Sequence, residues 1–113
     1  MRNENRAFAR APLTGPVKFF DWNRAQAADA VEISGSGIFL KTSQLLAEGS
    51  MLTLRLTLPG IRQAFTVLGK VVRTVKGGLF APAGMGIRFM DLRPNDRDCI
   101  VAYVTQRALQ EAA

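Results

Sequence analysis

The chain has 113 residues, of which 48% are hydrophobic and 21% charged, a balance typical of one globular domain and unlike that of a disordered protein. It has no histidine and a single cysteine, Cys99, which excludes an internal disulfide, metal sites built on His and Cys, and the Ser-His-Asp and Cys-His arrangements of hydrolases. Fifteen basic and nine acidic residues leave a net charge of +6, which favours an anionic partner over an enzymatic role.

The first fifteen residues are polar, carry three arginines and end in a stretch with Pro12 and Gly15. This composition predicts an N-terminal arm over residues 1–15, ahead of one compact domain over residues 16–113. No apolar run approaches the ~20 residues that span a bilayer, and the start lacks the apolar core of a signal peptide. We therefore expect a cytoplasmic protein without membrane insertion.

Six strands are expected in the first part of the domain, each bounded by turn residues. They cover residues 17–22, 30–33, 38–41, 52–58, 63–75 and 85–89. A polar, alanine-rich loop is expected over residues 23–29, and Ser34-Gly35-Ser36-Gly37 is a turn signal that predicts a hairpin. Leucines at every second position from Leu52 to Leu58 predict one buried face, and Gly69 is expected to mark a bend or bulge.

A helix is expected from Pro94 to Gln110. Pro94 suits a first helical turn, Asp96 and Asp98 favour the positive end of the helix dipole, and an apolar stripe runs along one side. Six short strands followed by one helix predict a mostly β fold, a six-stranded antiparallel barrel with a C-terminal α-helix over one opening or side.

Four motifs, taken together, resemble the PilZ domain family. Arg6 and Arg10 form an R-x-x-x-R pair in the arm, and the turn from Glu32 to Gly37 reads E-x-S-x-x-G. The strand Gly84-Met85-Gly86-Ile87-Arg88-Phe89 and the helix start Asp91-Leu92-Arg93-Pro94-Asn95-Asp96-Arg97 complete the resemblance, which runs from about Arg6 to about Gln106.

The resemblance implies a split barrel that acts as a receptor for the bacterial second messenger cyclic di-GMP. It assigns Arg6 and Arg10 to an arm that wraps the ligand, and Glu32, Ser34 and Gly37 to a turn that completes the site. The chemistry is consistent, because guanidinium groups pair with phosphate or with guanine O6 and N7, and a carboxylate accepts from guanine N1 and N2. It implies no metal and no cofactor beyond this ligand, and at 113 residues we expect a stand-alone receptor that signals to a protein partner.

Two other functions remain open on the sequence. The family has Asp or Asn where this chain has Glu32, so a PilZ-like adaptor that binds a protein but no nucleotide is the first alternative. The second is a small basic barrel that binds nucleic acid, as β-barrels do on single strands. The aromatic residues lie in the apolar rows of the expected strands and do not alternate with basic residues. We therefore expect no specific nucleic-acid binding.

Overall fold

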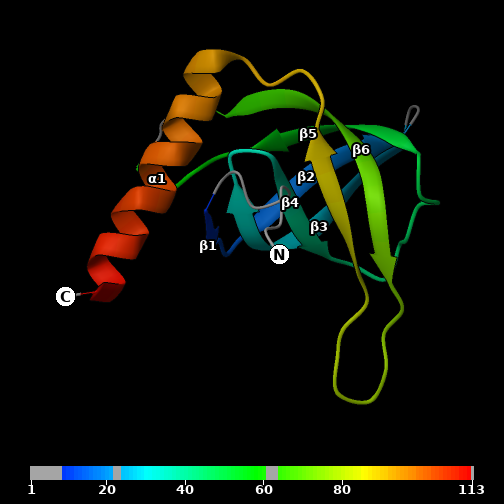
Figure 1. The fold of residues 1–113 in the computed structure, drawn as a ribbon. Helices are drawn as coiled ribbons and strands as arrows, with labels where there is room; N and C mark the ends of the chain where they lie inside the picture. The colour runs from blue at the N-terminus through cyan, green and yellow to red at the C-terminus, as the bar shows by residue number, and fades with distance from the viewer. Residues whose placement is uncertain (1–8, 22–23, 61–63, 113) are drawn as a thin grey trace, which may run out of the picture.

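Seven strands and one helix occur in the part of the chain that the computed structural model describes, residues 9–21, 24–60 and 64–112 (Figure 1). The strands are β1 (Arg10–Pro12), β2 (Pro16–Asp21), β3 (Arg24–Ser34), β4 (Gly37–Lys41), β5 (Met51–Leu56), β6 (Phe65–Val75) and β7 (Gly84–Phe89), and the helix is α1 (Pro94–Ala112). Across these residues no helix is both long and apolar enough to span a bilayer.

The sheet closes on itself. Its strand order is β1-β3-β2-β5-β6-β7-β4, and β3 also pairs with β4, so six strands form a closed ring and β1 is an extra strand on β3. Every strand pair is antiparallel. The predicted mostly β barrel of six antiparallel strands with a C-terminal helix is therefore confirmed, with one strand added.

Side chains of alternating polarity explain why these segments close around a core. In β5, Leu52, Leu54 and Leu56 are at most 2% exposed, while the residues between them face outward. β2 repeats the pattern with Val17 and Phe19 buried. Because strand side chains alternate between the two faces, each strand contributes one apolar row to the barrel interior.

The predicted loop over residues 23–29 is wrong where the structure describes it. Residues from Arg24 onward continue into β3 and pair with β2 up to Asp29, and the alanines Ala28 and Ala30 are buried. Alanine has a low intrinsic preference for strands, so the local sequence favoured a loop. Pairing with β2 along residues 24–29 supplies the hydrogen bonds that override this preference, and β4 joins the other edge from Asp29 onward.

The last part of the predicted arm joins the sheet. The Leu13 N–H donates to the Val31 carbonyl and the Ala30 N–H to that of Gly15, both at 3.0 Å, so β1 and β2 run along one edge of β3. Ala11 is buried, and Gly15 at the break between the two strands has a φ of 117°. A left-handed φ of this kind is accessible to glycine at little cost.

The bulge expected at Gly69 lies three residues further on. Gly69 pairs regularly with Leu52 and Phe89, and the register shifts between Val71 and Arg73. Gly69 serves close packing instead, since an added Cβ would lie 2.5 Å from the Ile87 side chain. The glycine was read as a bend, whereas the structure needs it for space.

Helix α1 lies against one end of the barrel (Figure 1). Ile100 and Val104 are buried in the core, and Cys99 and Tyr103 pack against it half-buried. The Tyr103 hydroxyl donates to the Pro12 carbonyl at 2.7 Å, and the Arg97 Nε donates to the Gly35 carbonyl at 3.1 Å. The predicted helix over residues 94–110 is confirmed, and its contacts hold β1 and the β3–β4 turn in place.

Candidate ligand-binding site

A cleft of about 530 Å³ lies on the outer surface of the barrel. Its lining comes from β1, the end of β3, β4, β6 and β7, and includes the β3–β4 turn. Four of the five residues expected at the ligand site are among its lining residues: Arg10, Glu32, Ser34 and Gly37. Arg6 lies outside the described residues, so its assignment stays an expectation.

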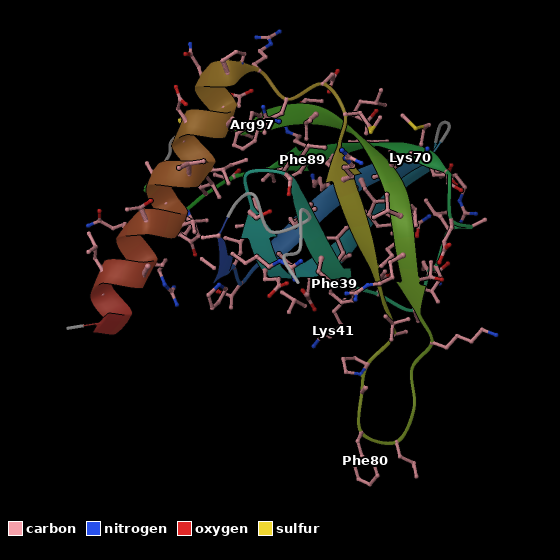
Figure 2. All side chains as sticks on the ribbon, in the orientation of Figure 1. Phe39, Lys41, Lys70, Phe80, Phe89 and Arg97 are labelled. Carbon is pink, nitrogen blue, oxygen red and sulfur yellow. The ribbon has the colours of Figure 1, made fainter. Side chains whose placement is uncertain are left out.

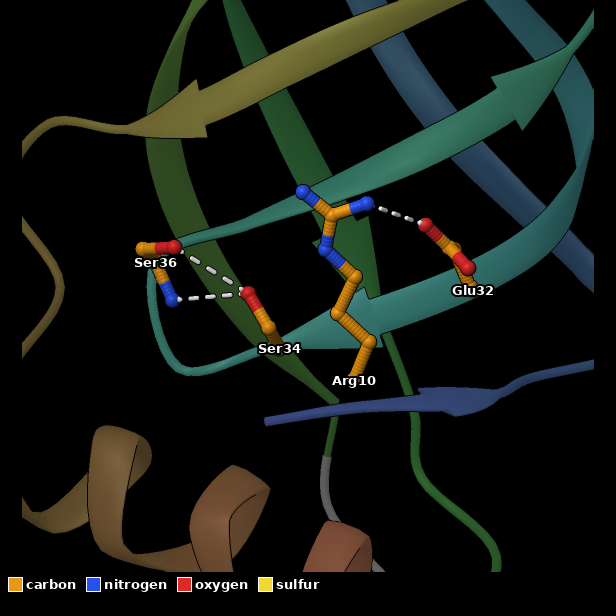
Figure 3. A network of polar contacts seen from close by, with 4 residues as sticks. All are labelled: Arg10, Glu32, Ser34 and Ser36. Atoms are coloured by element: carbon orange, nitrogen blue, oxygen red, sulfur yellow. Dashed lines mark hydrogen bonds and ion pairs between the residues drawn. The ribbon is translucent and has the colours of Figure 1, made fainter. Parts of the chain in front are cut away.

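Arg10 and Glu32 form an ion pair at the mouth of the cleft, with 3.1 Å between Nη1 and Oε1 (Figure 3). Arg10 lies opposite Ser34 in the β1–β3 pairing, and Pro12 lies opposite Glu32, so Arg10 and Glu32 are diagonal neighbours on one face. Such neighbours are within reach of long side chains. The two side chains are 45% and 40% exposed, which leaves both open to a ligand.

Ser34 is the buried polar residue of the site, with 6% of its surface exposed. Its Oγ accepts a hydrogen bond from the Ser36 N–H and lies 3.1 Å from the Ser36 Oγ (Figure 3). A serine side chain bonded to the backbone two residues on is a common way to fix a turn. Ser34 therefore shapes the β3–β4 turn as well as lining the cleft.

Gly37 allows two strands to approach each other. A Cβ at this position would collide with the carbonyl oxygen of Ile87 and would lie 3.4 Å from the Cα of Arg88. Gly37 pairs with Arg88 across β4 and β7, which is where the barrel wall forms the floor of the cleft. The resemblance placed this glycine in the turn that completes the ligand site, and in the structure it also lets β7 approach β4.

The cleft residues that the sequence did not assign include Phe39, Arg73 and Arg88. The Arg73 guanidinium carbon lies 5.3 Å from the centre of the Phe39 ring, a cation–π contact between β6 and β4. Gly86 of β7 lies between them, opposite both Arg73 and Phe39 in the pairing. Arg88 faces outward from β7, since it is exposed while Ile87 and Phe89 on either side are buried.

The bulge in β6 brings Arg73 to the cleft. Without it, Arg73 would share the inward parity of Val71, which is fully buried. The register shift instead places Arg73 opposite Gly86, on the outer face. An extra residue in one strand commonly redirects a side chain in this way. The signal available in the sequence was an arginine at an apparently inward position, where a buried charge is costly.

The charges of the cleft suit an anion. Arg10, Arg73 and Arg88 contribute three guanidinium groups, against the single carboxylate of Glu32. Guanidinium groups bind phosphate through paired, charge-assisted hydrogen bonds, and they also stack on planar rings. A ligand with two phosphates and flat bases matches both capacities.

A model of the PilZ domain matches residues 4–106 of the sequence, so the chain belongs to the PilZ domain family. PilZ proteins are receptor or adaptor domains rather than enzymes. None of the curated proteins matches the sequence.

Solved structures share the fold at low sequence identity. The Bacillus subtilis inhibitor of motility MotI/DgrA is 17% identical with a TM-score of 0.82, over 98% of this chain and 54% of that one. The PilZ domain of YcgR from Escherichia coli, solved with c-di-GMP, is 14% identical with a TM-score of 0.65, over 96% and 98%. The K. pneumonia MrkH–c-di-GMP complex is 15% identical with a TM-score of 0.69, over 99% and 54%. The chain thus spans about half the length of MotI/DgrA and of MrkH.

Proposed function

We propose that this protein is a non-enzymatic receptor that binds cyclic di-GMP in the barrel cleft and passes the signal to a protein partner. The observation that carries the proposal is the convergence of Arg10 from β1 with Glu32 and Ser34 from β3 at one cleft that has a surplus of guanidinium groups. The family of the chain and the cyclic di-GMP complexes of YcgR and MrkH support the choice of ligand.

The polar residues named here have distinct roles in this proposal. Arg10, with Arg6 from the preceding segment, pairs with phosphate or with guanine O6 and N7. Glu32 accepts hydrogen bonds from guanine N1 and N2, and the Ser34 hydroxyl adds a neutral contact. Arg73, supported on the Phe39 ring, offers a planar cation for stacking on a base.

Because Arg10 and Glu32 form an ion pair, ligand binding would replace this contact with contacts from each residue to the ligand. The Arg10 guanidinium has a carboxylate partner, Glu32, at 3.1 Å. A phosphate that takes Arg10 releases Glu32, and a guanine base then supplies donors for the released carboxylate. Because both groups are solvent-exposed, the pair contributes little to stability and opposes the exchange only weakly.

Isothermal titration with cyclic di-GMP tests this function. We expect saturable binding by the wild type and, because a charge-assisted bidentate pair is lost, a Kd raised by at least about tenfold in Arg10→Ala. Arg6→Ala tests the other arm residue in the same way. Arg24→Ala is the matched control, because Arg24 is an exposed arginine outside the cleft and should leave the Kd unchanged.

Two outcomes of the titration would contradict the proposal. Absence of heat at micromolar to millimolar ligand, or an Arg10→Ala variant that binds like the wild type, rules out this site. Equal binding of mixed oligonucleotides with a steep salt dependence would instead indicate generic attraction of polyanions.

A second candidate function is an adaptor that binds a protein and no nucleotide. The observation that favours it is the closed pair of Arg10 with Glu32, whose side chain is one methylene longer than the Asp or Asn of the family. A titration of Glu32→Asp separates the two candidates: nucleotide affinity that is present in this variant and absent in the wild type supports the adaptor.

A further inference from the structure

The loop between β6 and β7 carries the two most exposed large hydrophobic side chains of the described residues. Leu79 is 95% exposed and Phe80 98%, whereas the next is Leu109 on α1 at 64%. Figure 2 shows Phe80 at the far end of this loop, pointing away from the barrel. Two adjacent apolar side chains held wholly in water, at the end of a projecting loop, indicate a surface that another body covers.

Hydrogen bonds hold the loop in a defined shape. The Gly78 N–H donates to the Ala81 carbonyl at 2.8 Å, which closes a turn with Leu79 and Phe80 at its tip. At the base of the loop, the Thr42 N–H donates to the Ala83 carbonyl at 3.1 Å. The apolar tip is therefore preorganised, and little conformational entropy is lost when it is covered.

The positive charge of the chain is concentrated on the segment that carries this loop. Residues 49–90 contain no acidic residue and six basic ones: Arg55, Arg62, Lys70, Arg73, Lys76 and Arg88. The other residues have nine of each sign and no net charge. The net charge of +6 thus belongs to the part of the chain that forms β5, β6, β7 and the loop.

Basic side chains flank the loop at its base. Lys76 directly follows β6, and Lys41 lies opposite Gly84, the first residue of β7 (Figure 2). Asp29 of β3 lies opposite Lys41 in the β3–β4 pairing and is an acidic neighbour of the loop base.

We propose that the 76–83 loop docks this protein on an anionic lipid bilayer, with Leu79 and Phe80 inserted between headgroups and with Lys41 and Lys76, at the base of the loop, facing the lipid phosphates. Apolar side chains combined with a basic surface are the two signals that peripheral membrane binding uses. This surface contact is reversible. It differs from a membrane-spanning segment, which is the kind of membrane insertion that the sequence excluded. It does not depend on the proposed nucleotide site.

A bilayer fits the 76–83 loop better than a pocket on a partner protein does. Specific protein–protein contacts bury about 1,200–2,000 Å² in total, and a tip of two side chains flanked by Gly77-Gly78 and Ala81-Pro82-Ala83 offers little area of that kind. A bilayer needs only a few inserted side chains together with charge.

Co-sedimentation with vesicles tests the proposal. We expect the wild-type chain to partition onto vesicles of phosphatidylcholine with phosphatidylglycerol, and to bind vesicles of phosphatidylcholine alone at least about tenfold more weakly, because the anionic lipid attracts the basic residues. A Leu79→Ser, Phe80→Ser double variant should bind anionic vesicles about tenfold more weakly than the wild type, because the inserted side chains are lost.

Two further variants complete the test. Leu109→Ser with Val101→Ser removes two exposed apolar side chains from α1 and should leave the partition unchanged. Lys76→Glu with Lys41→Glu should weaken it in proportion to the anionic lipid, and more at low than at high salt. Circular dichroism confirms that each variant is folded, which is expected since all six positions are exposed.

Three results would overturn the proposal. The first is no partition of the wild type onto anionic vesicles, and the second is a tip variant that binds them as the wild type does. The third is the absence of vesicle binding together with capture of an acidic protein that the tip variant fails to capture, which would assign the loop to a protein partner.

Discussion

At the scale of single residues, the cleft depends on positions whose roles are set by their neighbours across the sheet. Arg73 reaches the cleft because one extra residue in β6 reverses its orientation. Glu32 reaches Arg10 because the two are diagonal neighbours in the β1–β3 pairing. Gly37 allows β7 to approach β4 closely because it lacks a Cβ. The sequence motifs include Arg10, Glu32 and Gly37 but not Arg73, and the strand pairing determines what each of them contacts.

Gly37 should be more important for folding than its place in a binding motif implies. In Gly37→Ala the new Cβ collides with the Ile87 carbonyl oxygen, and strained packing of this kind costs about 1 to 3 kcal/mol of unfolding free energy. Urea denaturation measures the change. Gly86→Ala is the control, because its nearest neighbour would be Arg73 at 3.7 Å, an ordinary contact. Equal stability of the two variants would refute the close-approach role.

At the scale of elements, β1 and α1 act together to hold Arg10. β1 is three residues long and pairs on one side with β3, so its own hydrogen bonds hold it weakly. Helix α1 adds a hydrogen bond from Tyr103 to Pro12 and covers this end of the barrel with Ile100. The C-terminal helix therefore supports the strand from which the cleft arginine extends.

Tyr103→Phe tests this support. Loss of one hydrogen bond to the Pro12 carbonyl should lower the unfolding free energy by about 1 kcal/mol. Hydrogen exchange should increase most at Ala11 and Leu13, because the freed strand opens locally before the barrel does. Val101→Ala, a change at a 38% exposed position of the same helix, should leave both measurements unchanged. Faster exchange spread evenly over the barrel would show that Tyr103 stabilises the whole fold instead.

At the scale of the whole molecule, charge is divided between two parts of the chain. Residues 49–90 carry the net charge of +6 and supply Arg73 and Arg88 to the cleft, while the neutral remainder supplies Arg10 and Glu32. The cleft lies where these parts meet, between β3–β4 and β6–β7. An anion bound there joins strands that are distant in the sequence, so binding should stabilise the entire barrel.

Thermal unfolding with and without cyclic di-GMP tests this expectation, which rests on the proposed function. A ligand that binds only the folded state adds about 2.7 kcal/mol at one hundred times its Kd. For a domain of this size each kcal/mol corresponds to about 4 °C or more, so Tm should rise by about 10 °C. Arg10→Ala should show a much smaller rise at the same ligand concentration. An unchanged Tm of the wild type at millimolar ligand would argue against binding in the cleft.

The sequence by itself determined the fold class, most of the strands, the helix and the motif positions of the candidate site. Alternation of Leu52, Leu54 and Leu56 and the apolar stripe of α1 are local patterns, and local patterns are visible without a structure. The first part of β3, residues 24–29, was predicted as a loop because its alanines carry no strand signal and its stability comes from pairing with β2.

Only the tertiary structure decided which residues meet. The bulge that turns Arg73 outward, the approach of β7 to Gly37 and the exposure of Leu79 and Phe80 all depend on register and on what lies across the sheet. Sequence periodicity reports which face a residue prefers and contains no information about its partner. Closure of the barrel by β3 and β4 supplies that information, because it sets every strand's neighbours at once.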